Sequence, residues 1–509
     1  MYQKKSSFVK LFAFVLIIFQ FYSCVNEPVD LSPAIVDGGN FGNSVLGEKK
    51  IIPFTVENMQ NAYLSLLNNP TASKYPSSGE LFKEGGYQIH TTHYYVKFHP
   101  QDSLQYERII NDSILEVSDE PFEYTIDSEG DKYQDPSLAG TQFTYYYSVM
   151  PVDHQFPQDV NFEIIANLHF TPEDEIGSNP SEIQKEEIDF YYDLNLETLK
   201  LTDNLDTEDK EELFYLFSMP NGSQQQMTYQ EAINQGHFFK DMVIDYSEID
   251  DETERRRSWN PSGIITVHED AIFQNIGVNG ARVRVRKWGF LVIRRATTNS
   301  QGFFVTSSTR TKRVKYSVFF KHNPLFVVKA GTVFWNARDI GHRTHKREAW
   351  RRHYQSGIKQ FYSLIHNAAY DYYTRISPNY NIHHPGYYKK IVGKDWYNTT
   401  SHHLNNLTAA FALYDIRITR GSGGVYRGSD GIYATTVHEL THASHKSMDS
   451  GMFSVFESGS NNRLIIMESW AEGVETIVTN DRYNILTSNN YQSSSLIDNS
   501  GRWNSFRQR

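Results

Sequence analysis

The stretch GARVRVRKWGFLVIRRATTNSQGFFVTSS, residues 280–308, carries the clearest strand pattern in the chain. Val283 and Val285 alternate with arginines, and side chains that alternate along a strand point to opposite faces of a sheet. The turn residues NSQG lead into FFVTSS, and KRVKYSVFF at 312–320 supplies another alternating strand. We therefore predict a small antiparallel β-sandwich over residues 256–329. Its arginine face is expected to be solvated and to guard an edge against aggregation.

The residues before this sandwich mix helix and strand signals. PFTVENMQNAYLSLLN at 53–68 has apolar residues at helical spacing after a capping threonine, Thr55. HTTHYYVKFHP at 90–100 and FTYYYSVMP at 143–151 have the aromatic and β-branched content of strands. These signals predict an α+β domain over residues 51–255, which ends in a charged, turn-rich linker.

The amino terminus has the layout of an export signal. Lysines precede the apolar run 11–21, which is too short to span a bilayer as a mature helix. Cys24, the only cysteine, follows small Ser23, and residues 1–23 resemble the signal peptide of bacterial lipoproteins. The resemblance implies that Cys24 carries the lipid anchor. Because Val25 is not the aspartate that marks inner-membrane retention, we expect anchoring to the outer membrane, on its periplasmic or cell-surface side.

Composition narrows the possibilities further. The chain has 509 residues, too many for one core, so several domains of roughly 100 to 200 residues each are expected. A net charge of -11 argues against nucleic acid as a partner. Residues 24–50 are rich in Pro, Gly, Asn and Asp, and they predict a flexible tether. A single cysteine excludes intramolecular disulfides, so the domains depend on their cores.

From about residue 330 the pattern becomes helical. HKREAWRRHYQSGIKQFYSLIHNAAYDYYTRI at 345–376 has apolar and aromatic residues every three to four positions. We predict a mainly helical carboxy-terminal domain over residues 330–509. The fold class is therefore multidomain α+β, with the small β-sandwich in the middle.

The segment VHELTHASHKSM at 437–448 carries the strongest chemical signal. His438 and His442 are four residues apart, so on a helix both imidazoles can face one Zn²⁺ ion at about 2.0 to 2.1 Å. Glu439 is placed to reach a metal-bound water rather than the metal, as in the His-Glu-x-x-His motif. The spacing therefore predicts two zinc ligands and a general base.

A second predicted helix, RLIIMESWAEGVETIVT at 463–479, carries Glu468, Glu472 and Glu475 at spacings of four and three. Acids spaced in this way repel one another by a few tenths of a kcal/mol per pair. A cation beside them would remove that cost, which points to a third metal ligand on this helix.

Together the two segments resemble the gluzincin metallopeptidases, and HELTH is itself a common string in that family. The resemblance implies a zincin-like domain in which Glu468 is the third zinc ligand. It also implies that Glu472 hydrogen-bonds a ligand histidine and fixes its tautomer. For the oxyanion-stabilising residue, the sequence leaves open Tyr433, Tyr483, Tyr491 and His403. The metzincin pattern does not fit, and His445 is expected to be a surface residue.

Two functions follow as hypotheses. The first is a membrane-anchored zinc metalloendopeptidase that hydrolyses a peptide or protein substrate, with Glu439 as general base. The second is a surface lipoprotein that binds glycan or protein ligands and carries an inactive zincin-like domain. The intact Glu439 favours the first. The other histidine pairs, at 342 and 345, 383 and 384, and 402 and 403, lack a carboxylate at ligand spacing and are not expected to bind metal.

Overall fold

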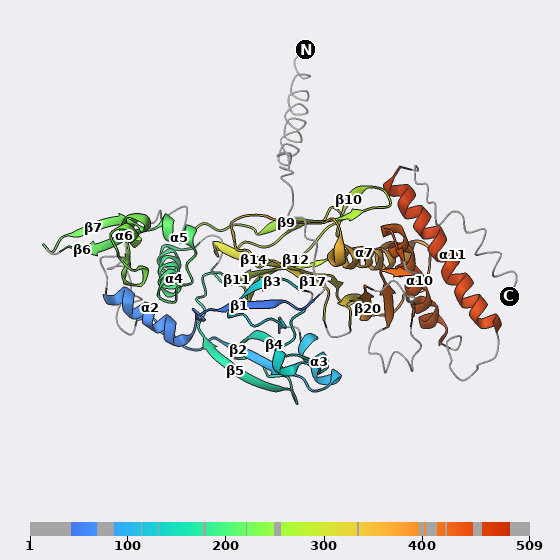
Figure 1. The fold of residues 1–509 in the computed structure, drawn as a ribbon, viewed down its shortest axis with the longest axis horizontal. Coiled ribbons are helices and arrows are strands. Elements are labelled where there is room, and N and C mark those ends of the chain that lie inside the picture. The colour runs from blue at the N-terminus through green and yellow to red at the C-terminus, as the bar shows by residue number, and fades with distance from the viewer. Residues whose placement is uncertain are drawn as a thin grey trace, which may run out of the picture. The chain divides into compact units, whose positions relative to one another are not determined.

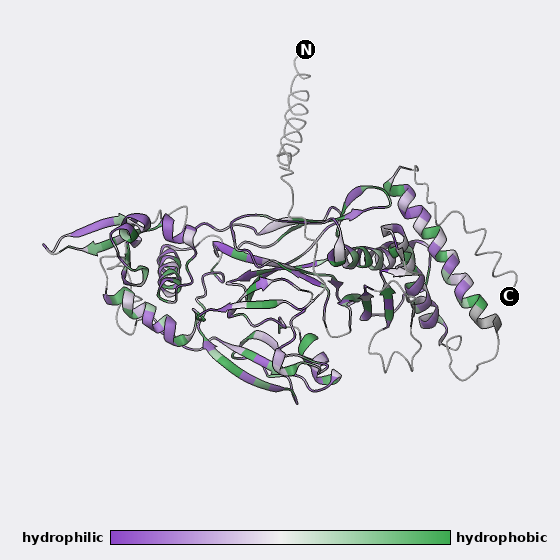
Figure 2. Cartoon of the chain, in the orientation of Figure 1, coloured by the Kyte–Doolittle hydropathy of each residue, from purple (hydrophilic) through white to green (hydrophobic). Residues whose placement is uncertain are grey.

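The protein combines helices with several small sheets, which confirms a mixed α+β class (Figure 1). The computed structural model describes residues 42–68, 86–112, 114–130, 132–176, 180–219, 221–248, 256–332, 335–395, 402–403, 415–422, 425–450 and 461–488. The predicted signal peptide, Cys24 and most of the predicted tether lie outside these residues. Among the described helices, none has both the length and the apolar character needed to cross a membrane. Figure 2 accordingly shows polar and apolar residues interspersed along α11 (Asn461–Leu486).

The amino-terminal region has the predicted helix and strands. Helix α2 (Val56–Asn68) begins after Thr55, whose hydroxyl accepts a hydrogen bond from Asn58 N at 3.2 Å. Strand β2 (His93–His99) lies between β4 (Tyr146–Pro151) and β5 (Asn161–Leu168), antiparallel to both. The other elements are α3 (Ser103–Ile110), η3 (Pro136–Leu138), α4 (Glu182–Leu201), α5 (Thr207–Glu212), β6 (Phe214–Ser218), β7 (Gln224–Thr228), α6 (Tyr229–Asn234), η4 (Phe239–Asp241), β8 (Val243–Ile244) and η5 (Tyr246–Glu248).

The end of the predicted tether is part of the fold. Strand β1 (Val45–Lys49) pairs antiparallel with β3 (Tyr124–Ser128), so these five residues are not the flexible segment that their composition predicted. Backbone pairing with a strand about 80 positions away in the sequence is invisible to a composition argument.

The central region forms two sheets. One contains β9 (Ser262–Glu269), β10 (Gln274–Gly277) and β13 (Phe303–Val305); the other contains β12 (Leu291–Thr297), β11 (Arg282–Lys287) and β14 (Arg313–Phe319). Later strands complete both sheets: β19 (Trp350–Tyr354) joins β9 in parallel, while β17 (Arg338–Ile340) and β18 (His345–Lys346) join β14. The sheets therefore run past residue 329, where the sequence placed their end.

The arginine face of β11 is not solvated, contrary to the prediction. Strand β11 is flanked on both sides by β12 and β14, so it is not an edge. Arg284 is only 7 % exposed and forms an ion pair with Glu116 from the amino-terminal region. Arg295 and Arg282 reach the same carboxylate at 2.8 and 3.4 Å. Alternation revealed two faces, but only the tertiary structure shows that a second layer covers the polar one.

The carboxy-terminal region contains a mixed sheet with the strand order β15 (Lys321–His322), β16 (Phe326–Ala330), β20 (Lys389–Lys394), β22 (Ile416–Thr419), β21 (His402–His403). Strands β16, β20 and β22 are parallel, and β21 is antiparallel to β22. A short hairpin, β23 (Gly421–Ser422) and β24 (Val425–Tyr426), follows. The expectation of a mainly helical domain did not include this sheet, because short strands escape a search for helical periodicity.

Three long helices accompany this sheet. Helix α7 (Gly357–Asp371) continues into a π-helical turn, η7 (Tyr372–Ile376), and α8 (Ser377–Asn379). Helix α10 (Ser429–Met448) packs against both α7 and α11 (Figure 1). Val283 of β11, Phe361 of α7 and Val437 of α10 belong to one hydrophobic core. The regions predicted as the second and third domains therefore share that core.

Candidate metal centre

Two helices position every predicted site residue. Helix α10 carries His438, Glu439 and His442, and helix α11 carries Glu468 and Glu472. Asp270, in the turn after β9, accepts a hydrogen bond from Ser429 N at 2.8 Å and so places a negative charge at the start of α10. Along α11, Ala471, Val474 and Val478 form a buried apolar stripe. Burial of this stripe fixes the rotation of α11 about its own axis and thereby aims its carboxylates.

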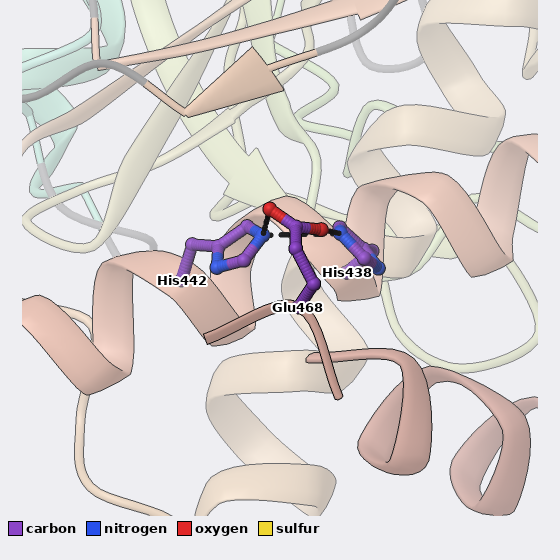
Figure 3. Close-up of side chains that lie close together, drawn as sticks. All are labelled: His438, His442 and Glu468. Atoms are coloured by element: carbon purple, nitrogen blue, oxygen red, sulfur yellow. Dashed lines mark hydrogen bonds and ion pairs between the residues drawn. The ribbon is translucent and has the colours of Figure 1, made fainter. Parts of the chain in front are cut away.

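The structure brings His438, His442 and Glu468 together (Figure 3). The Nε2 atoms of the two histidines lie 3.0 Å apart. Glu468 Oε2 lies 3.3 Å from His438 Nε2, and Glu468 Oε1 lies 3.5 Å from His442 Nε2. Ligands at about 2.0 to 2.1 Å from a tetrahedral zinc ion are separated from one another by about 3.3 Å. The two Nε2 atoms and the two oxygens of the Glu468 carboxylate therefore lie at distances comparable to those between ligands of one such ion, and one ligand atom from each residue lies within 4.8 Å of the other two.

The charges around this triad favour a cation. Burial lowers the pKa of His438, but hydrogen bonds with Glu468 and Glu475 outweigh this effect and raise it to about 10. The hydrogen bonds from His438 and His442 hold the pKa of the Glu468 carboxyl well below its usual range. Without a metal, the centre thus keeps an extra proton on an imidazole. Metal binding replaces such a proton, since a ligand imidazole must be neutral.

Another acid of α11, Glu475, contacts His438 on the side of the imidazole ring that faces away from the triad. Its Oε2 atom lies 2.9 Å from His438 Nδ1, the ring nitrogen that faces away from the triad. When Nδ1 carries the proton of the neutral imidazole and donates a hydrogen bond to this carboxylate, the lone pair of Nε2 is free to bind metal. The family pattern assigned this role to Glu472, which is buried on the same helix. The observed contact points to Glu475 instead, and the role of Glu472 stays a prediction. In the sequence, the spacing identifies Glu475 only as one of three acids on this helix and gives it no role.

Glu439 lies beside the triad on α10. Its side chain is only 5 % exposed, and its charge contributes to the raised pKa of His438. A carboxylate that is buried next to the donor atoms can accept a proton from a nucleophilic water bound among them. This placement fits the predicted general base.

A buried polar network holds α10 and α11 in place. The Tyr433 hydroxyl on α10 donates to Asp371, which also accepts from Arg375 at 2.8 Å. On α11, the Tyr483 hydroxyl donates to Glu269 of β9 at 2.8 Å. These partners engage both tyrosines in the scaffold, which argues against either as the oxyanion-stabilising residue.

The other two candidates for that role are Tyr491 and His403. Tyr491 falls outside the described residues. His403 lies on strand β21, which contacts α10. His445, which was expected at the surface, is instead 8 % exposed, because its position on α10 faces the packed interior.

Histidines of two of the remaining pairs lie in the described part of the chain with these surroundings. His342 lies 3.9 Å from both Glu120 and Glu129, beyond hydrogen-bond distance. His384 Nδ1 accepts a hydrogen bond from Gly386 N at 3.0 Å, an ordinary turn contact. Within the described part of the chain, the His438, His442 and Glu468 triad is the one group of His, Cys, Asp and Glu side chains with metal-ligand spacing.

Comparisons with protein families and with curated proteins find no relative of this chain. No protein-family model matches the sequence, and a search of curated proteins finds no match. The function is therefore inferred from the side chains of the centre itself.

Proposed function

We propose that this protein is a zinc-dependent metallopeptidase, with Zn²⁺ held by His438, His442 and Glu468. The observation that carries the proposal is that the two Nε2 atoms lie 3.0 Å apart and that each lies 3.3 to 3.5 Å from an oxygen of the Glu468 carboxylate. Two nitrogens and one carboxylate form the ligand set of catalytic zinc sites that leave a fourth position for water or substrate. A structural zinc site would instead use four protein ligands.

The chain's own residues supply the rest of the chemistry. Bound zinc would lower the pKa of a coordinated water to about 7 and polarise a carbonyl oxygen. Glu439 accepts the proton of the attacking water and returns it to the leaving amine. Glu475 keeps the Nδ1 proton on His438, so that the Nε2 lone pair points into the centre.

The mixed sheet offers a place for an extended peptide. Strand β21 is paired with β22 on one side, and α10 contacts both strands. No described strand pairs with the other side of β21. A substrate segment that added to this edge would make backbone hydrogen bonds close to the helix that carries the zinc ligands.

Zinc content and peptide hydrolysis test the two halves of the proposal separately. Purified protein is expected to hold one zinc ion, and His442→Ala is expected to lose it. His445→Ala, which removes the next histidine on the same helix, is the matched control and should retain the metal. Equal zinc stoichiometry in all three proteins would refute the ligand assignment.

The general base is tested by Glu439→Gln. This variant should keep its zinc, while cleavage of a peptide library falls by about a hundredfold to ten-thousandfold. Undiminished cleavage in Glu439→Gln would rule out the mechanism even if the metal site stands.

We also propose export and lipid anchoring through Cys24, supported by the amino-terminal sequence. Cys24→Ser should move the protein from the membrane fraction to the soluble exported fraction. A membrane-bound Cys24→Ser variant would contradict the anchor.

A binding role is the second candidate. A cavity of about 230 Å³ between the amino-terminal region and the central strands is lined by Tyr95, Phe122, Trp288 and Phe290, and aromatic walls of this kind suit glycan or peptide ligands. Binding of such ligands that survives a chelator, without any hydrolysis, would favour this function over the peptidase.

A further inference from the structure

A large cavity on another part of the chain concentrates positive charge. Its volume is about 810 Å³, within the range of small-molecule sites. Its walls come from β11 and from three strands of the mixed sheet, β15, β16 and β20, opposite the end of α3. The cavity thus forms only where three distant parts of the sequence meet, and the proposed zinc ligands do not line it.

The side chains that line this cavity are out of charge balance. They include five cations and three carboxylates: Arg282, Arg284, Lys321, Lys329 and Lys390, with Glu107, Asp112 and Glu116. Each carboxylate already has a partner. Glu107 pairs with Lys390, Asp112 with His154, and Glu116 with three arginines. When all five cations are protonated, the lining therefore carries a surplus of about two positive charges.

Two lysines account for this surplus. Lys321 is 9 % exposed, and among the described residues no acceptor hydrogen-bonds to its ammonium group and no carboxylate pairs with it. Lys329 is 1 % exposed, and its ammonium donates only to the neutral Asn336 amide, at 2.8 Å, within the described part of the chain. Buried ammonium groups without a counter-charge are costly and therefore rare.

The electrostatics reflect this cost. Burial and the neighbouring Arg284 and Arg282 lower the pKa of Lys321 to about 7. Burial and the neighbouring Lys390 and Lys321 lower the pKa of Lys329 to about 7 as well. An anion in the cavity would reverse both effects, because it would supply the missing acceptors and the missing charge.

We propose that this cavity binds a small organic ligand through a phosphate group, which Lys321 and Lys329 hold. A phosphate monoester carries a charge of about -1.5 to -2 at neutral pH, which matches the surplus on the walls. The volume leaves room for an organic part beyond the phosphate, against Phe319 and Phe326. Tyr388, which is 70 % exposed, lies at the mouth where such a ligand would enter.

Calorimetric titration with inorganic phosphate tests the site on the full chain. Wild type is expected to bind phosphate at one saturable site. Lys321→Met and Lys329→Met keep the aliphatic stem but remove the charge, and each should weaken binding by about tenfold to a hundredfold. The metal-free variant His442→Ala should bind phosphate like wild type, so the zinc centre cannot account for the signal.

Lys315→Met is the matched control. Lys315 lies on β14, and burial lowers its pKa to about 8. It lines the cavity with the aromatic walls instead of the proposed phosphate site. This variant should bind phosphate as wild type does. Thermal unfolding adds a second measurement. Without phosphate, Lys321→Met should melt at the wild-type temperature or higher, because a buried uncompensated charge has been removed.

Several results would overturn the proposal. One is the absence of saturable phosphate binding up to about 10 mM. Another is binding in Lys321→Met as tight as in wild type. If Lys321→Met does not fold, Arg282→Gln takes its place, since the Arg282 side chain is 29 % exposed. Arg282→Gln should weaken binding by about two- to fivefold, and unchanged affinity would refute the site.

Discussion

The contact between Glu475 and His438 gives the sharpest prediction about the metal centre. Glu475 Oε2 lies 2.9 Å from His438 Nδ1, and the two side chains are only 9 % and 19 % exposed, so solvent screens the interaction little. A hydrogen bond to a charged group contributes about 1.5 to 3 kcal/mol, against about 0.5 to 1.5 kcal/mol for a neutral one. Glu475→Gln, which keeps an acceptor oxygen, should therefore weaken zinc binding by about tenfold. Glu475→Ala removes the acceptor and should weaken it by about a hundredfold.

Competition with a chromophoric chelator at neutral pH measures these affinities. Glu472→Gln is the decisive comparison, because the family pattern gives Glu472 the role that the structure gives to Glu475. Ile477→Gln, at an exposed position on α11, controls for general effects on that helix. Zinc binding in Glu475→Ala within about threefold of wild type would refute the reasoning. A larger loss in Glu472→Gln than in Glu475→Gln would restore the pattern's assignment.

Three further predictions concern the scaffold. Glu116→Ala leaves three arginines without their shared carboxylate and should lower the free energy of unfolding by about 3 to 5 kcal/mol in urea denaturation. Glu163→Ala, which breaks the ion pair between Lys97 and a glutamate side chain that is 60 % exposed, should cost no more than about 1 kcal/mol. Equal losses in Glu116→Ala and Glu163→Ala would contradict the buried cluster. Asp371→Asn should cost about 2 to 3 kcal/mol at pH 7. Burial raises the pKa of Asp371, but Arg375 and Arg482 hold it below its usual range, so the stabilisation exists above pH about 4 and is lost as the pH falls further. The stability gap between wild type and Asp371→Asn should therefore narrow from pH 7 to pH 3, and a constant gap would contradict the pair. Tyr372→Phe removes a hydroxyl that lies 2.9 Å from Ser444 Oγ and should lower stability by about 1 kcal/mol, while zinc affinity stays unchanged.

Much of the local structure could be predicted because it depends on local patterns. Apolar spacing predicted α2 and α11, and the His-Glu-x-x-His motif indicated α10. Aromatic and β-branched content predicted β2 and β4, and alternation predicted β11. The pattern failed where a residue's environment is set by distant segments. Arg284 alternates like a solvated strand residue, yet Glu116, more than 160 positions away, pairs with it in the interior. Residues 45–49 look like a tether, yet they pair with β3.

For the candidate centre, the sequence by itself determined which residues can be ligands. The four-residue spacing of His438 and His442 places them on one helical face whatever the rest of the chain does. Only the tertiary structure decided that Glu468 meets them and that Glu475 contacts His438, because both depend on how the buried stripe of α11 packs against α10. The surplus of charge at Lys321 and Lys329 likewise arises only when separate strands converge, since no local pattern records which charges will share a cavity.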